Sequence, residues 1–219
     1  MLCRILGEGT RPLLKTLEEI RARVGDSLAL TVRLNAFDST PYPGGWGLRQ
    51  EDGVLVPDLE EPARLCALLR DRGVSIINIS ASQPRQRLFG GDPDPRAKPY
   101  TGACDLMAAA RELKHRAPGV YFVGTGFSQF RQFGPAVGAG GIRDGWFDFA
   151  GFGRQALAYP AFAEAALSGQ LPDPDKCCIL CSSCFRLMDP GHCAAGCVVR
   201  DPELYGALYR ENVLNRKKQ

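Results

Sequence analysis

The sequence lacks the features that would assign it to a membrane, to an export route or to nucleic acid. No apolar run approaches the ~20 residues that a membrane-spanning helix needs. The opening residues MLCRIL are too short for the hydrophobic region of a signal peptide and carry no cleavage pattern. The net charge is only +3, and lysine and arginine are scattered except in the tail 216–218. We therefore expect no membrane and no nucleic-acid partner, and a solvated tail.

Histidine is also scarce, and neither of its two copies follows a predicted strand. His115 lies in the charged run KHR at the end of a predicted helix, where a solvated side chain is expected. His192 neighbours a group of cysteines and could serve there as a ligand.

Cysteine, by contrast, is abundant. The chain holds nine cysteines, and six of them fall within 176–201. Without export features we expect a cytoplasmic protein whose thiols stay reduced, and in that compartment clustered cysteines are more often metal ligands than disulfides. Cys66 and Cys104 stand apart on predicted helices, and we expect both to be small core residues.

The clustered cysteines have the spacing of a metal site. Three of them follow C-x2-C-x2-C spacing, and a fourth comes thirteen positions later. Three thiolates can then converge from one turn while the fourth closes a tetrahedron, which suits either zinc or an iron–sulfur cluster. Cys177 and Cys193 are spare, and spacing leaves open a set that uses Cys193. The predicted ligands are Cys178, Cys181, Cys184 and Cys197.

Hydrophobic periodicity predicts strands that alternate with helices. The predicted helices are 10–24, 59–72, 101–116, 127–141 and 155–168, and the predicted strands are 28–35, 74–80, 119–126 and 146–152. Such alternation indicates a parallel α/β sheet, either doubly wound or part of a (β/α)8 barrel. Two long loops, 36–57 and 81–100, follow the carboxyl ends of strands, where barrel enzymes carry their active sites, and they favour the barrel.

Two glycine-containing turns could bind a phosphate. One follows the third predicted strand and the other, 151–154, follows the fourth; each opens into a helix, where backbone N–H groups and a guanidinium favour an anion. The first turn, GTG, lacks the third glycine of a dinucleotide-binding fingerprint. Tight turns of this kind also need glycine for structural reasons alone, and that alternative stays open.

Arg33 is predicted to face away from the helices. Alternation along LALTVRLN places it on the side of Thr31 and Asn35. In a barrel that side is the interior, where an arginine near the mouth is a plausible ligand contact. An edge-facing or salt-bridged Arg33 is the alternative.

Four stretches together resemble a known family. They are VRLNAFD, VGTG, DFAGFGRQALAYP, and CCILCSSC followed by GCVVRDPELY. They resemble the second half of the FMN-dependent Old Yellow Enzyme family, and most closely its iron–sulfur branch, the NADH:flavin oxidoreductases that include the 2,4-dienoyl-CoA reductases. The opening GTRPLLKTLEEIRARVG also looks like the family's helix before the fifth barrel strand.

The resemblance implies a fold and a set of cofactor-binding residues. The fold would be the C-terminal half of a TIM (β/α)8 barrel, about four βα units over 1–170, followed by a small cysteine-rich iron–sulfur segment over 171–219. Arg33 would lie by the flavin pyrimidine ring, and the four predicted cysteine ligands would hold a [4Fe–4S] cluster. The implied FMN-phosphate residues are Gly124, Thr125, Gly126, Gly153 and Arg154.

The implied function is that of an FMN-dependent NAD(P)H:flavin oxidoreductase. Family members take a hydride from NAD(P)H onto FMN and deliver it to an enone, an enoyl thioester or a related small acceptor, with protein groups tuning the cofactor. The alternative is a non-catalytic iron–sulfur or zinc-binding protein whose α/β part is a docking scaffold.

The sequence departs from the family in two ways. The family's dienoyl-CoA reductase-like members have C-x2-C-x3-C spacing, whereas the third cysteine here comes one residue earlier. The family's first four strands, with their flavin-ring contacts, their substrate-binding His/Asn or His/His pair and their proton-donating tyrosine, have no counterpart. We therefore assign no catalytic residue and expect a truncated chain. Half a barrel would expose strand edges, so we expect self-association or a partner that supplies the other half.

Overall fold

A computed structural model describes residues 9–38, 40–81, 98–188 and 195–215. The chain divides into two compact units. The first comprises residues 1–126 and 138–151, and the second comprises 127–137 and 152–219. Helix α4 (Gly134–Arg143) begins in the second unit and ends in the first.

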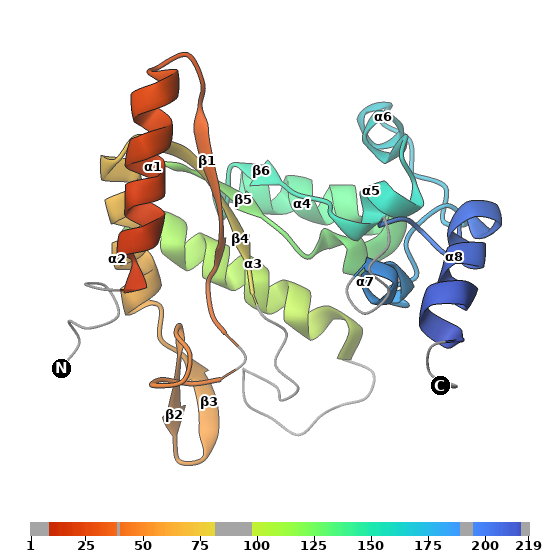
Figure 1. Cartoon of the computed structure of the whole chain (residues 1–219), viewed down its shortest axis with the longest axis horizontal. Helices are drawn as coiled ribbons and strands as arrows, with labels where there is room; N and C mark the ends of the chain where they lie inside the picture. The colour runs from red at the N-terminus through yellow and green to blue at the C-terminus, as the bar shows by residue number, and fades with distance from the viewer. Residues whose placement is uncertain (1–8, 39, 82–97, 189–194, 216–219) are drawn as a thin grey trace. The chain divides into compact units, whose positions relative to one another are not determined.

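The first unit is built on a parallel sheet of four strands. In spatial order these are β1 (Leu30–Asn35), β4 (Val74–Ser80), β5 (Tyr121–Gly124) and β6 (Phe149–Ala150), which is also their order along the chain (Figure 1). All three pairings are parallel. The prediction of a parallel α/β sheet is therefore confirmed, with strands at the four expected places, although β6 is only two residues long.

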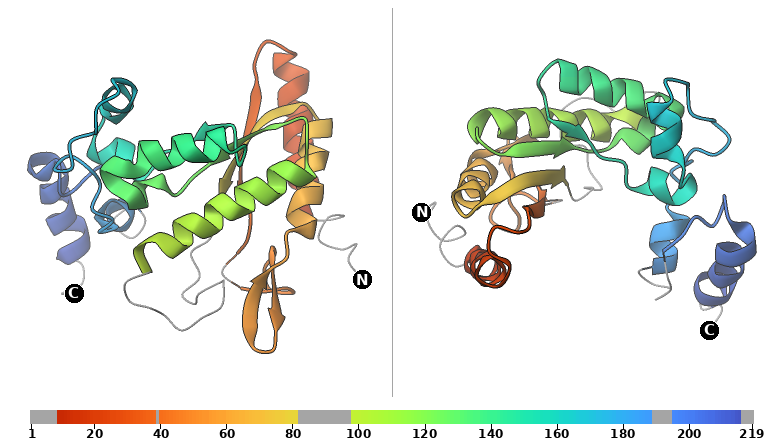
Figure 2. Two further views of the ribbon diagram at one scale, coloured as in Figure 1. Left: turned by 180° about the vertical axis from the view of Figure 1, so that it is seen from behind. Right: turned by 90° about the horizontal axis from the view of Figure 1, so that it is seen from above.

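Three helices cover one side of this sheet. They are α1 (Arg11–Val24), α2 (Glu60–Asp71) and α3 (Lys98–Arg116), and Figure 2 shows them following one another along the same side of the strands. Gly25 and Gly73, just after α1 and α2, have φ of 57° and 78°, a conformation that glycine adopts without steric cost. Apolar side chains between the layers are fully buried, among them Leu69, Ile77, Ile79, Leu113 and Phe122.

The opposite side of the sheet carries exposed side chains. Along β1, Leu30 and Leu34 are buried while Arg33 is exposed, which confirms the predicted alternation. On the same side, Tyr121 and Phe149 are 58% and 47% exposed and touch edge to face, with ring centroids 6.0 Å apart. Parallel sheets are normally buried on both sides, so this exposed side is unusual.

The segment predicted as a long loop contains a β-hairpin, so that prediction was incomplete. Strands β2 (Leu48–Glu51) and β3 (Val54–Pro57) pair antiparallel. Their turn is Asp52-Gly53, with φ of 47° and 81°. Asp-Gly is a strong signal for a two-residue hairpin turn, because both central residues of that turn need positive φ. The second long loop lies largely outside the described residues.

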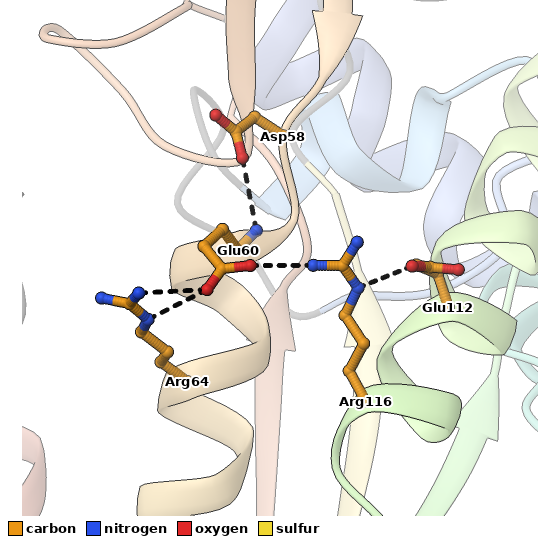
Figure 3. A network of polar contacts seen from close by, with 5 residues as sticks. All are labelled: Asp58, Glu60, Arg64, Glu112 and Arg116. Atoms are coloured by element: carbon orange, nitrogen blue, oxygen red, sulfur yellow. Dashed lines mark hydrogen bonds and ion pairs between the residues drawn. The ribbon is translucent and has the colours of Figure 1, made fainter.

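A network of charged groups joins the surface of α2 to that of α3 (Figure 3). Glu60 bonds to Arg64 at 3.1 Å within α2 and to Arg116 of α3 at 3.0 Å. Glu112 accepts from Arg116 at 2.6 Å, and this bond raises the pKa of the arginine. All of these groups are solvent-accessible, so each pair contributes about 0.2–1 kcal/mol at most and the network orients the helices rather than forming a site.

In its described part, the second unit contains short helices and no strand. The single helix predicted over 155–168 is wrong: the structure has α5 (Arg154–Ala158) and α6 (Phe162–Leu167) instead. They separate at Tyr159-Pro160, because proline lacks an N–H and disfavours a helical conformation in the residue before it. The remaining helical segments are η2 (Phe127–Phe133), α7 (Ser183–Met188), η3 (Pro202–Gly206), α8 (Ala207–Tyr209) and η4 (Arg210–Leu214).

No helix among the described residues has both the length and the apolar character needed to cross a membrane.

Candidate metal centre

The four predicted ligands line one small cavity in the second unit. Its volume is ≈ 20 Å³, and Arg154 and Arg200 also line it. For comparison, a single buried water needs about 10–15 Å³. The cysteines that share the cavity are Cys178, Cys181, Cys184 and Cys197.

The sulfur atoms share this cavity without taking up ligand geometry. Across the described ranges, no three His, Cys, Asp or Glu side chains form a group that could hold a metal ion. The seven described cysteines are all free thiols. The structure therefore brings the donors of a thiolate site to one place, and the binding of a metal would have to draw them closer together.

The backbone around these cysteines directs N–H groups at sulfur. Leu180 N–H donates to Cys178 Sγ at 3.4 Å, and Arg200 N–H donates to Cys197 Sγ at 3.4 Å. Leu180 and Ser182 adopt φ of 61° and 58°, which is uncommon for residues other than glycine. Strained backbone of this kind clusters at functional sites, and hydrogen bonds to sulfur favour the thiolate that metals bind.

The thiols of this cavity differ in acidity. Burial raises the pKa of Cys181, but the hydroxyl and backbone N–H of Ser183 and the charge of Arg186 outweigh burial, so the pKa lies below its ordinary value. Burial also raises the pKa of Cys178, and there it prevails over the Leu180 N–H and the charge of Arg154. The donor set thus suits a thiophilic metal, because a positive ion would stabilise each thiolate further.

The other sulfur and histidine candidates lie elsewhere. Cys177 is fully buried, and its Sγ donates to the carbonyl of Asp173 at 3.3 Å. His192 and Cys193, the alternative ligands, lie outside the described residues. His115 is exposed near the end of α3, as expected for a solvated side chain.

Of the two cysteines on helices, only one is a core residue. Cys66 of α2 is fully buried, and burial raises its pKa to about 12, which makes it an inert core thiol as predicted. Cys104 of α3 is exposed, so its assignment to the core was wrong.

Three of the predicted phosphate-binding residues close strand β5 in the first unit. A Cβ atom at Gly124 would lie 2.6 Å from the ring of Phe147, and Gly126 has φ of 100°. Packing and backbone conformation therefore explain both glycines without a ligand. The hydroxyl of Thr125 donates to the carbonyl of Ile79 at 2.6 Å, which ties this turn to β4.

Gly153 and Arg154 belong to the second unit. Gly153 precedes α5, and a Cβ atom there would meet nothing within 4 Å. Arg154 begins α5 and lines the cysteine cavity. Packing therefore gives no reason for glycine at 153, in contrast to 124.

Arg33 lies on the exposed side of the sheet in the first unit. Its Nη1 donates to the side-chain oxygen of Asn78, opposite it on β4, at 3.3 Å. It is thus neither at the helix-facing side nor in the core, and it is accessible to a ligand.

Comparison with known proteins adds nothing to this geometry. No family model and no curated protein matches the chain.

Proposed function

We propose that this chain is part of an FMN-dependent NAD(P)H:flavin oxidoreductase that carries a [4Fe–4S] cluster on its cysteine-rich segment. The observation that carries the proposal is the cavity shared by the four cysteines, because side chains up to 19 positions apart (197 − 178) converge there with N–H groups directed at sulfur. Hydrogen bonding to thiolate sulfur is one of the means by which proteins tune iron–sulfur clusters.

The flavin part of the proposal rests on the sequence resemblance. When bound, FMN would take a hydride from NAD(P)H and pass it to an enone, an enoyl thioester or a related acceptor. Arg33 would then orient the flavin ring from the exposed side of the sheet. The proposed phosphate contacts are Gly124, Thr125, Gly126, Gly153 and Arg154.

We further propose that the parallel sheet is half of a (β/α)8 barrel. Chain-order pairing, helices on one side and exposed rings on the other are what such a half would show. The exposed side would be covered by four further βα units from another polypeptide segment. Purification of this chain alone tests the proposal: we expect self-association in light scattering, and a stable FMN-loaded monomer would contradict it.

A zinc-binding scaffold is the second candidate. The cavity has room for about one atom-sized group. A single tetrahedral ion fits that space directly, whereas a cluster would have to expand the cavity as it forms.

Anaerobic purification with metal, sulfide and flavin analysis separates these candidates. Flavin absorption bands together with a broad brown shoulder and sulfide support the oxidoreductase. A brown shoulder without flavin indicates an iron–sulfur carrier, and a colourless protein with stoichiometric zinc indicates the scaffold. Cys181→Ser is expected to lose the metal while Cys104→Ser, an exposed cysteine on α3, retains it.

A further inference from the structure

One peptide unit beside the cysteine cavity is held at both of its polar ends by distant side chains. This unit joins Cys177 to Cys178. Its carbonyl accepts from Arg200, at 3.2 Å from Nε and 2.9 Å from Nη2. Its N–H donates to Gln155 Oε1 at 3.1 Å. The peptide plane from which the Cys178 side chain projects is therefore fixed from two directions.

These bonds lie in a buried environment. Cys177 and Gln155 are fully buried, and Cys178 is 8% exposed. A buried peptide group without a partner is destabilising, so Arg200 and Gln155 supply the hydrogen bonds that water would otherwise make. The amide nitrogen of Gln155 is left unsatisfied: within the described part of the chain, its buried Nε2 has no hydrogen-bond partner. Its amide is thus oriented with the oxygen toward the Cys178 N–H.

Arg200 also reaches the other end of the cysteine motif. Its guanidinium holds the Cys177 carbonyl, while its backbone N–H donates to Cys197 Sγ. Arg200 therefore contacts the carbonyl that precedes Cys178, the first predicted ligand, and also the sulfur of Cys197, the last predicted ligand.

Gln155 is itself anchored by its backbone. Its N–H donates to Ser128 Oγ at 3.3 Å, and its carbonyl accepts from Tyr159 N–H at 2.8 Å. The acceptor for Cys178 thus sits on a fixed helix, α5, rather than on a free loop.

We propose that Gln155 and Arg200 are positioning residues of the metal centre. Together they hold the Cys177–Cys178 peptide unit so that Cys178 Sγ faces the shared cavity, and Arg200 keeps Cys197 beside it. Neither side chain contacts the metal. This inference rests on the proposed metal-binding function, and it adds two residues that act through the ligands.

The test is the rate at which loaded protein releases metal to a chelator. The chain is reconstituted anaerobically with iron and sulfide, and in parallel with zinc, and then exposed to excess EDTA. Gln155→Met and Arg200→Met retain bulk but lose the hydrogen bonds. Since partners of metal ligands are worth about 10–100-fold in metal affinity, we expect release to be faster by that factor in both variants. The number of cysteines protected from alkylation should fall in parallel.

Matched controls separate positioning from a general loss of structure. Gln170→Met and Arg210→Met make the same substitutions at exposed positions of the second unit and should release metal at the wild-type rate. Gln155→Glu keeps an oxygen acceptor for the Cys178 N–H and should restore most of the retention. A purely structural role would not be rescued in this way.

Wild-type release rates in both Gln155→Met and Arg200→Met would overturn the inference. If Gln155→Met fails to fold, Arg200→Met decides alone, because Arg200 is only partly buried. A wild-type chain that retains neither iron nor zinc would overturn the proposed function instead, and with it the reason for these two residues to hold the peptide.

Discussion

Different interactions stabilise the interior of each of the two units. The first has a strand ladder and a layer of fully buried apolar side chains such as Ile77, Ile79 and Phe122. The second, in its described part, has short helices, and it fully buries Gln155 and Cys177 beside the apolar Phe127 and Leu187. The side chains of Gln155 and Arg200 form hydrogen bonds to backbone groups of the cysteine-rich segment.

This difference predicts that the stability of each unit has a different source. Burial of apolar surface stabilises the first unit whether or not a ligand is bound. The second also buries apolar side chains, but it brings four thiols to one cavity, so its stability should depend in addition on the proposed metal.

Removal of the proposed metal should destabilise the second unit and leave the first nearly unchanged. Structural metal binding is worth on the order of 10 kcal/mol in small thiolate sites, so chelation should expose the second unit to local unfolding. Hydrogen exchange read by mass spectrometry should show lost protection over 152–188 and 195–215 and retained protection in β4 and β5. Equal loss in both units, or loss in neither, would contradict the contrast.

A cavity in the core of the first unit should have the reverse effect. Phe122→Ala removes a fully buried ring and should lower the free energy of unfolding by about 3–5 kcal/mol. Urea unfolding measures the loss. Metal content per folded chain should stay at the wild-type value, and a parallel loss of metal would show that the two units are coupled.

The glycines of the two predicted phosphate turns should respond differently to alanine. Gly124→Ala places a methyl group 2.6 Å from the ring of Phe147 and should cost about 1–3 kcal/mol. Gly153→Ala meets nothing within 4 Å and should change stability by about 0.5 kcal/mol or less. If Gly153 contacts the FMN phosphate, its substitution should weaken FMN binding without weakening the fold, and titration with FMN measures this.

A smaller effect should follow from Asp105 in α3. Burial raises its pKa to about 6, from an ordinary value of 3.8. The folded state then binds more protons than the unfolded state between these two values, so stability should fall as pH rises from about 4 to 6. The side chain is only partly buried, so we expect about 1–2 kcal/mol. Asp105→Asn should flatten this part of the profile in urea unfolding at pH 4.5 and 7.5, and an unchanged slope would show that Asp105 is not its source.

The sequence predicted the first unit better than the second. Strands such as 74–80 and the ends of α1 and α2 follow from apolar periodicity and from glycine, which are local signals. The hairpin was missed although Asp52-Gly53 signals it, because the Gly- and Pro-rich composition of 36–57 favoured a loop. The exposure of Cys104 depends on what packs against α3, which periodicity does not give.

Within the site, the cysteine pattern predicted four residues that the structure places around one cavity, while metal binding by them stays a prediction. The roles of Gln155 and Arg200 could not be predicted in the same way. Each lies 23 positions from the cysteine whose backbone it holds, and no local pattern marks a glutamine as buried or an arginine as bonded to a carbonyl.

X-ray absorption at the edge of the metal that the wild-type chain retains tests directly whether the four cysteines are its ligands. We expect four sulfur neighbours at about 2.3 Å, together with iron–iron scattering if the centre is a cluster. The sulfur shell should be lost in Cys181→Ser protein. A metal surrounded mainly by nitrogen and oxygen, or the same sulfur shell in Cys181→Ser protein, would show that these cysteines do not form the centre.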